Sequence, residues 1–392
     1  MAEWVECKIS DIGTVVGGAT PSTKKTENYE GGNIAWITPK DLSTLSGRYI
    51  KCGERNITEI GLKNCSTQLL PKNTVLFSSR APIGYVAIAA NEVCTNQGFK
   101  SVIPNEAIDP LFLFYLLKHN KDKIEAMGSG TTFKEVSGNT MKNIIVRVPL
   151  DKEVQKNIAS MLGALDDKIE ENKRINNNLE EQAKAIFSNE FLTLETLPDG
   201  WNQASLIDIA DYLNGLAMQK YRPTADETGI PVLKIKELRQ TCCDDNSELC
   251  SPNIKSEYII QDGDVIFSWS GSLLVDFWCG GICGLNQHLF KVTSNKYNKW
   301  FYYAWTKHHL DRFIAVAADK ATTMGHIKRD ELAKAKVLIP NEADYQRIGA
   351  LLQPIYDLII SNRIENKKLS SLRDTLLPKL ISGELDVSNI DF

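Results

Sequence analysis

The fold is decided by residues 151–190, which read DKEVQKNIASMLGALDDKIEENKRINNNLEEQAKAIFSNE. Apolar residues recur in this stretch at alternating steps of four and three, which is the heptad spacing of a coiled-coil seam. The seam positions, interrupted by two asparagines, are Ile158, Leu162, Leu165, Ile169, Asn172, Asn176, Leu179, Ala183 and Ile186. The spacing predicts one helix of about 40 residues, roughly 60 Å long at about 1.5 Å per residue.

A second seam lies about 190 residues further along the chain. Its positions are Ile348, Leu352, Ile355, Ile359, Asn362, Asn366, Leu369, Arg373 and Leu376. Asn172 and Asn176 of the first seam therefore correspond to Asn362 and Asn366 of the second. A buried asparagine costs stability but fixes helix register, because a slipped partner leaves its amide unpaired. We expect an antiparallel coiled coil with these asparagines at mid-length. The alternative is that the amides are solvated and break the seam.

The whole chain is an internal duplication. Residues 75–78 (VLFS) recur as 265–268 (VIFS), and residues 96–97 (NQ) recur as 286–287. An offset near 190 is far too long for a solenoid, so each half is predicted to be a globular part followed by a helix. The expected segments are 1–150 (first globular part), 151–193 (central helix), 194–340 (second globular part), and 341–392 (C-terminal helix and tail).

Short β-rich runs separated by turn signals fill each globular part. They include residues 34–37, 74–77 and 85–88, and helical stretches follow at 110–123 and 298–317. This pattern predicts an α+β fold with small β-sheets. A duplicated chain has pseudo-two-fold symmetry, and two-fold symmetry matches the dyad of duplex DNA.

Composition restricts the class of protein. The 392 residues are 43% hydrophobic and 24% charged, which is ordinary for a globular protein of two or three domains. No apolar run approaches the roughly 20 residues that span a bilayer, and no signal sequence begins the chain, so a cytoplasmic protein without a membrane partner is expected. Nine irregularly spaced cysteines without a CxxC pair favour reduced thiols and no metal site.

The net charge of −4 argues mildly against a nucleic-acid binder, whose footprint is usually basic. Residues 151–190, with nine acidic and six basic side chains, account for −3 of it. Because binding depends on local charge, the globular parts are not excluded as nucleic-acid binders.

Catalytic motifs are absent from the sequence. There is no GxxxxGK[ST] loop, no GxGxxG after a strand, and no Asn-Pro-Pro-Tyr or Asp-Pro-Pro-Tyr of the kind that adenine methyltransferases carry. His119, His308 and His309 lie in predicted helices without metal-ligand spacing. We therefore expect a non-catalytic protein that binds no cofactor or metal itself.

Four stretches resemble the specificity (S) subunits of type I restriction–modification systems. They are residues 34–42 (IAWITPKDL), 79–88 (SRAPIGYVAI), 128–134 (GSGTTFK) and 372–385 (LRDTLLPKLISGEL). With the duplication, the resemblance covers essentially the whole chain, although the second half has residues 270–273 (SGSL) where the first has an arginine in RAPIG. The resemblance implies two target-recognition domains that each read half of a bipartite site in double-stranded DNA, while the helices set the gap between the halves.

The same resemblance implies partner subunits. A methylation subunit, usually in two copies, would dock on the helices and methylate adenine at N6 from S-adenosylmethionine. Restriction subunits that use ATP and Mg²⁺ can join to form an endonuclease. Two rival hypotheses remain: a structural scaffold that tethers partner proteins without reading DNA sequence, and a stand-alone DNA-modifying enzyme, which the missing motifs disfavour.

Candidate DNA-binding residues of the first half follow predicted strands or lie in a glycine-rich loop, where side chains can change without harm to the fold. They are Thr38, Lys40, Arg80, Gln97, Thr131, Thr132 and Lys134. Arg80 suits guanine and Gln97 suits adenine in bidentate contacts, and a glycine-rich backbone can approach phosphate. The alternatives are that Arg80 pairs with an internal acid, that the threonines cap turns, and that the recurring Asn96-Gln97 is architectural.

Candidates of the second half occupy the corresponding loops. They are Gln219, Lys220, Lys234, Lys236, Ser268, Trp269, Ser270, Thr322, Thr323, His326 and Lys328. Lys234 and Lys236 are placed on a strand, and these two and Lys328 are candidates for phosphate contacts, which carry no sequence information. Trp269 is expected either to pack against a base or sugar or to belong to the core, and His288 is expected to be structural.

Overall fold

The computed structural model describes residues 2–130, 134–319, 327 and 329–387, and of Asp319 only the backbone. The chain forms two compact units. The first consists of Met1–Glu170 with Leu369–Phe392, and the second of Glu171–Lys368. Each unit contains small β-sheets and a segment of each of two long helices, so the expected α+β class is confirmed.

The first unit is built on a five-stranded sheet in the order β2-β9-β6-β7-β4, with two smaller sheets, β5-β3-β8 and β1-β10. Its strands are β1 (Trp4–Lys8), β2 (Gly13–Gly17), β3 (Ile34–Ile37), β4 (Tyr49–Ile50), β5 (Arg55–Ile57), β6 (Val75–Ser79), β7 (Ile83–Ala89), β8 (Cys94–Thr95), β9 (Lys100–Pro104) and β10 (Ile145–Pro149). Its short helices are α1 (Ile9–Ile12), η1 (Thr26–Asn28), α2 (Pro39–Ser43), α3 (Glu59–Lys63), α4 (Pro110–His119), α5 (Lys121–Ala126) and α6 (Gly138–Lys142).

The second unit repeats this plan, with sheets β12-β19-β16-β17, β14-β13-β18-β15 and β11-β20. Its strands are β11 (Asn202–Ser205), β12 (Asp211–Asn214), β13 (Ile230–Leu233), β14 (Leu249–Cys250), β15 (Ile259–Ile260), β16 (Val265–Ser268), β17 (Leu274–Phe277), β18 (Cys283–Leu285), β19 (Leu289–Thr293) and β20 (Lys336–Ile339). Its short helices are α8 (Leu206–Ile209), η3 (Met218–Lys220), α9 (Ile235–Gln240), η4 (Ser256–Tyr258), α10 (Lys299–His308), α11 (Leu310–Asp319) and α12 (Arg329–Ala333).

The central strands β6 and β16 are buried along their whole length. Each has a neighbour on both edges and is covered on both faces, so its first three residues are all apolar instead of alternating, and buried serines follow them. In the first unit, Phe77 of β6 and Phe112 of α4 are fully buried in one core. Phe267 of β16 and Phe301 of α10 occupy the same places in the second unit.

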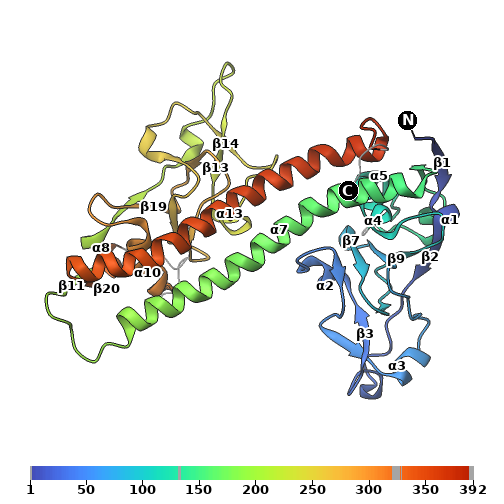
Figure 1. Cartoon of the computed structure of the whole chain (residues 1–392), viewed down its shortest axis with the longest axis horizontal. Coiled ribbons are helices and arrows are strands. Elements are labelled where there is room, and N and C mark those ends of the chain that lie inside the picture. Colours follow the sequence, from blue (N-terminus) through green and yellow to red (C-terminus); the bar gives the residue numbers. More distant parts are fainter. Residues whose placement is uncertain (1, 131–133, 320–326, 328, 388–392) are drawn as a thin grey trace. The chain divides into compact units, whose positions relative to one another are not determined.

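The two long helices are α7 (Lys152–Phe187) and α13 (Glu342–Ser382), of 36 and 41 residues, and each is continuous in Figure 1. A π-helical turn, η2 (Ser188–Leu192), follows α7. In the second unit, Asn172 bonds Asn366 and Asn362 bonds Asn176, both over 2.9 Å. The earlier asparagine of α7 pairs with the later one of α13, and the later one of α7 pairs with the earlier one of α13, so the helices are antiparallel. The predicted coiled coil is confirmed.

Three local predictions were wrong. The helices expected at 110–123 and 298–317 are each divided into two, at Asn120 and at His309. Lys234 and Lys236 do not lie on a strand, because β13 ends at Leu233 and Lys234 caps helix α9. The backbone N–H of Lys234 donates to the carboxylate of Glu237 over 3.2 Å, and this bond stabilises the helix start.

Candidate DNA interface

The first unit gathers four loops at one end of its main sheet. We call this region the first loop cluster; it comprises residues 17–20, 79–81, 96–100 and 134–137. Four backbone hydrogen bonds of 2.7–3.0 Å hold it: Ala19 N–H to Thr95 C=O, Asn96 N–H to Ile37 C=O, Ser79 N–H to Gly98 C=O, and Val136 N–H to Ser79 C=O. The sheet therefore fixes loops whose side chains come from distant parts of the sequence.

Three predicted residues meet in this cluster. Arg80 lies 3.7 Å from Glu135, which also pairs with Lys100 at 3.3 Å. The Arg80 side chain is 36% exposed, so the expected internal acid is present and an accessible edge of the guanidinium remains. The amide oxygen of Gln97 accepts a hydrogen bond from Thr20, and Lys134 is exposed beside Glu135. Thr131 and Thr132 lie outside the described residues.

The hydrogen bond to Gln97 bears on how this residue can read a base. A bidentate contact to adenine needs both the oxygen and the nitrogen of the amide. In this geometry the oxygen is already engaged by Thr20. Asn96 is architectural, because its side-chain oxygen accepts from the backbone N–H of Gly98 over 2.8 Å.

Thr38 and Lys40 lie at the start of α2. The hydroxyl and the backbone N–H of Thr38 both donate to Asp41, over 2.6 and 2.7 Å. Thr38 is therefore a helix cap, as one of the alternatives had it. Lys40 pairs with Glu54 at 2.6 Å on the surface, where an ion pair is weak enough for a phosphate to compete.

The second unit reproduces the loop cluster with three of the four corresponding backbone bonds. The second loop cluster comprises residues 214–217, 268–272, 285–290, 327 and 329. Its bonds, of 2.9–3.2 Å, are Leu216 N–H to Leu285 C=O, Asn286 N–H to Leu233 C=O, and Ile327 N–H to Trp269 C=O. Each corresponds to a bond of the first cluster at offsets of 190–197 residues. At this end of the sheet, the duplication seen in the sequence therefore extends to individual backbone hydrogen bonds.

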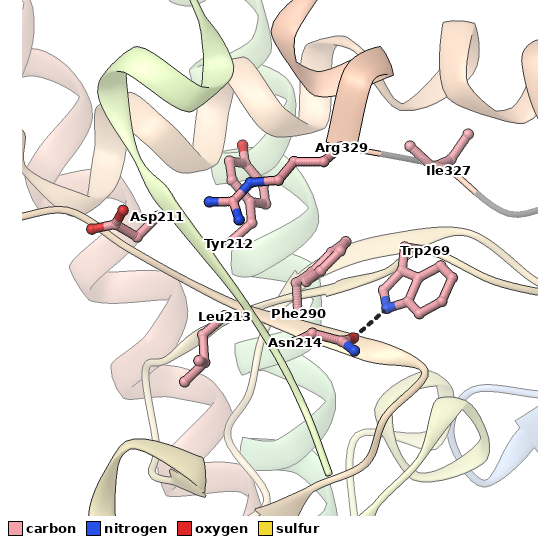
Figure 2. Close-up of a pocket in the computed structure, with 8 residues that line it drawn as sticks. All are labelled: Asp211, Tyr212, Leu213, Asn214, Trp269, Phe290, Ile327 and Arg329. Atoms are coloured by element: carbon pink, nitrogen blue, oxygen red, sulfur yellow. Dashed lines mark hydrogen bonds between the residues drawn. The ribbon is translucent and has the colours of Figure 1, made fainter. Parts of the chain in front are cut away.

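A hollow of about 750 Å³ opens at the second cluster. Figure 2 shows its lining residues, which are Asp211, Tyr212, Leu213, Asn214, Trp269, Phe290, Ile327 and Arg329. The indole N–H of Trp269 donates to the side-chain oxygen of Asn214 over 3.0 Å. The Trp269 and Phe290 ring centroids are 5.6 Å apart. Arg329 is exposed and has no ion-pair partner among the residues that the structure describes.

Ser268 and Ser270 differ from Trp269 in accessibility. Ser268 is fully buried, and its hydroxyl donates to the carbonyl of Ser272 over 2.9 Å, as Ser78 does to Pro82 over 2.8 Å in the first unit. Burial and this turn-holding bond argue against a DNA contact by Ser268. The Ser270 hydroxyl is hydrogen-bonded to Nδ1 of His288 over 3.1 Å, and the residue is 3% exposed.

The predicted lysines of the second half are spread over other surfaces. Lys234 pairs with Glu248, and Lys236 pairs with Asp244 at 3.0 Å. Gln219 and Lys220 are exposed on the η3 turn. Thr322, Thr323, His326 and Lys328 lie outside the described residues.

Several residues of the two clusters were missed by sequence reasoning. They are Thr20 and Lys100 in the first cluster, and Asn214, Phe290 and Arg329 in the second. A signal existed for Asn214, because it ends β12 as Gly17 ends the corresponding β2, 197 residues earlier. No signal existed for the bond between Asn214 and Trp269, which are 55 residues apart.

The described residues contain neither a cluster that could hold a metal ion nor a helix that could span a membrane. No group of three or more His, Cys, Asp or Glu side chains there could hold a metal ion. No helix in that same portion is both long and apolar enough to traverse a bilayer. The nine cysteines are all free thiols.

Comparison with known proteins assigns the chain to a family. The family model described as "Type I restriction modification DNA specificity domain" matches residues 1–181 and again 198–371. The chain belongs to this specificity-domain family. One relative, the specificity subunit of the type I restriction enzyme MjaIX from Methanocaldococcus jannaschii, is 35% identical over 99% of this chain and 95% of its own length.

Two further comparisons span the same length. The specificity subunit of the type I restriction enzyme HindI from Haemophilus influenzae is 20% identical over 98% of this chain and 100% of the relative. The crystal structure of the type I restriction–modification S subunit from M. genitalium superposes with a TM-score of 0.59 at 16% identity, covering 97% of this chain and 96% of that one. This structure shares the fold. Each match to the specificity-domain model contains one of the two loop clusters.

Proposed function

We propose that this specificity-domain protein is the DNA sequence-recognition subunit of a type I restriction–modification complex. Each globular part reads one half of a bipartite DNA site, and the helices α7 and α13 set the length of the unread gap. The chain itself performs no chemistry in this scheme. It selects the DNA sequence on which partner subunits act.

One observation carries the proposal. The family model matches the chain twice, and each match contains a loop cluster held by corresponding backbone bonds. The scaffold of the cluster is constant, whereas its side chains differ at corresponding positions: Gly17 against Asn214, Ser79 against Trp269, and Arg80 against Ser270. A constant frame with different side chains is what two half-sites of different sequence require.

The buried asparagine pairs support a measuring role for the helices. A bipartite site with a fixed gap needs helices that cannot slide by a turn. A one-turn slip of α13 along α7 would move Asn362 away from Asn176 and leave two buried amides unpaired, at about 1–3 kcal/mol for each. These contacts favour one register strongly.

The partners and cofactors belong to the same proposal. We infer that methylation subunits, in two copies, dock on the helices and transfer a methyl group from S-adenosylmethionine to N6 of adenine. Restriction subunits that use ATP and Mg²⁺ would join them for cleavage. The chain would hold none of these cofactors, and its own ligand would be double-stranded DNA.

Single-molecule mapping of N6-methyladenine in the host genome, with the gene intact and deleted, tests this function. Loss of a two-part motif with a fixed gap on deletion is the expected result. Loss of a continuous motif would contradict the assignment of one half-site to each globular part. Unchanged methylation in a host that expresses the methylation subunit would favour the scaffold hypothesis instead.

A further inference from the structure

The Asn214 amide has a defined orientation, unlike most surface amides. The indole nitrogen of Trp269 carries a hydrogen and can only donate, so the atom 3.0 Å from it must be the amide oxygen of Asn214. The amide nitrogen is therefore turned away from the indole, as Figure 2 shows. Among the described residues nothing accepts a hydrogen bond from this nitrogen, and Asn214 is exposed.

This orientation limits which base edges Asn214 can read. A free asparagine pairs with adenine through one donor and one acceptor. With its oxygen bonded to Trp269, the part of the Asn214 amide that lacks a partner among the described residues is its pair of N–H donors. Major-groove atoms that match a donor are O4 of thymine, O6 or N7 of guanine and N7 of adenine, whereas cytosine presents only an amino group and does not match.

The surroundings of the amide distinguish thymine from guanine. Trp269 and Phe290, which are both partly exposed, give the hollow an apolar wall beside the Asn214 donor. Thymine is the base that presents an acceptor next to an apolar group, because its C5 methyl adjoins O4. Guanine presents two acceptors and no methyl, and its usual partner is a bidentate arginine. Adenine presents its N7 acceptor beside a polar amino group, which does not suit an apolar wall.

We propose that Asn214 and Trp269 read a thymine in the half-site of the second globular part. Asn214 donates to O4, and the apolar wall of the hollow receives the C5 methyl group. Trp269 is a positioning residue, because it holds the amide in the donor orientation. Arg329, exposed on the rim, contacts a neighbouring phosphate. This inference rests on the proposed function and specifies the chemistry of one recognised base.

The first test is Asn214→Asp, assayed in the complex of the full chain with its methylation subunits. The carboxylate keeps the shape and still accepts from Trp269, but it presents an acceptor where the amide presented a donor. Methylation of the wild-type site should fall about ten- to hundred-fold, and sites with cytosine or adenine at one position should become the better substrates. The half-site of the first globular part should remain unchanged.

A second variant, Trp269→Phe, tests the positioning role. It keeps an aromatic ring but removes the N–H that holds the amide oxygen. The freed amide can then turn and form the bidentate pair with adenine N6 and N7, so discrimination of thymine against adenine should fall about tenfold at the same position. The matched control is Asn202→Asp on β11, an exposed asparagine in a different sheet of the same unit, which should leave both the motif and the rate unaltered.

Base analogues test the inference with the wild-type chain and so do not depend on variant folding. Deoxyuridine removes the C5 methyl, and 5-methyl-2-pyrimidinone removes O4. At one thymine of the second half-site, each substitution should slow methylation by at least about fivefold.

The inference is overturned if no thymine responds to both analogues. It is equally overturned if Asn214→Asp leaves the rate within about twofold of wild type, or if the base it affects is guanine. In all these cases the wild-type complex would still methylate a bipartite motif. Failure of the proposed function itself would show as the absence of any such motif.

Discussion

Asn362 donates its side-chain amide to the oxygen of Asn176 over 2.9 Å, and both residues are almost fully buried between α13 and α7. Asn176 in turn donates to the backbone carbonyl of Ile359 over 3.3 Å. A polar pair in an apolar seam contributes little net stability when it is complete, but it is costly when one member is lost. The pair therefore specifies the helix register more than it strengthens the helix contact.

This asymmetry gives a double-mutant prediction. Asn176→Leu should lower the free energy of unfolding by about 1–3 kcal/mol, because the Asn362 amide is left buried without its partner. Adding Asn362→Leu should restore most of that loss, since a leucine pair suits the seam. Urea denaturation of the single and double variants measures both effects. Asn177→Leu on the exposed face is the control, expected within about 0.5 kcal/mol of wild type. A double variant no more stable than Asn176→Leu would refute the pairing argument.

Arg80→Gln should weaken binding of the complex to its DNA site by about tenfold, because a guanidinium contact to phosphate or guanine is lost. If the contact is to phosphate, the slope of log K against log salt should fall by about one. Lys72→Gln is the control, because it removes one positive charge as Arg80→Gln does. Lys72 lies in the turn before β6, at the opposite end of that strand from Arg80. Equal losses for the two variants in a fluorescence anisotropy titration would mean that the first loop cluster has no special place in binding.

Asp166 is a buried carboxylate in the first unit with two close donors. It accepts from the Tyr115 hydroxyl and from Arg373, both over 2.6 Å. Burial opposes its ionisation, but these two hydrogen bonds hold the pKa of Asp166 below its ordinary 3.8. Asp166→Asn should cost about 1–3 kcal/mol of unfolding free energy, because Arg373 loses its buried carboxylate partner and, among the described residues, keeps only the exposed Asp374, at 2.8 Å.

The depressed pKa fixes the pH dependence of this contribution. The folded state binds the proton less readily than the unfolded state, so the stabilisation is complete at neutral pH and declines only below about pH 4. Asp122→Asn on the exposed face of α5 is the control and should be nearly neutral. Thermal unfolding at pH 7 that shows no difference between the two variants would contradict a structural role for Asp166.

His309 provides a pH effect at milder acidity. Burial lowers the pKa of His309 to about 4. Its Nε2 carries the hydrogen and donates to the backbone carbonyl of Lys336 over 2.8 Å, because a carbonyl can only accept. Between about pH 6.5 and 4 the unfolded state binds a proton that the folded state does not, so stability rises with pH across this window. The expected loss from pH 7.5 to 5 is about 2 kcal/mol. His309→Gln keeps a donor and should remove this part of the pH dependence; an unaltered dependence in urea titrations would exclude His309 as its source.

The sequence predicted the large features because they rest on periodicity. The heptad spacing around Asn172 and its repeat located both long helices, and the apolar run at β6 and β16 located the centre of each main sheet. The strand expected at Lys234 failed for a local reason. Its alternating pattern has period two, but Glu237 caps the backbone of Lys234 and a helix begins there, although lysine is not a usual capping residue.

The candidate sites were predictable only in part. Arg80, Gln97 and Trp269 could be predicted as candidates because they follow predicted strands, where side chains can change without harm to the fold. The same criterion selected Ser268, which is buried by its own turn. The orientation of Asn214 depends on a hydrogen bond between strands far apart in the chain, and no spacing rule contains that information.

The first and last strands of each globular part pair with each other, with Trp4 opposite Pro149 in one and Asn202 opposite Ile339 in the other. The chain thus enters and leaves each part at neighbouring points. Each globular part can therefore be exchanged as a unit. A recombination event that replaces the segment between the paired strands would replace one DNA preference with another. The long helices, and the subunits proposed to dock on them, would be inherited unchanged, so the DNA preference of one globular part could change while that of the other is kept.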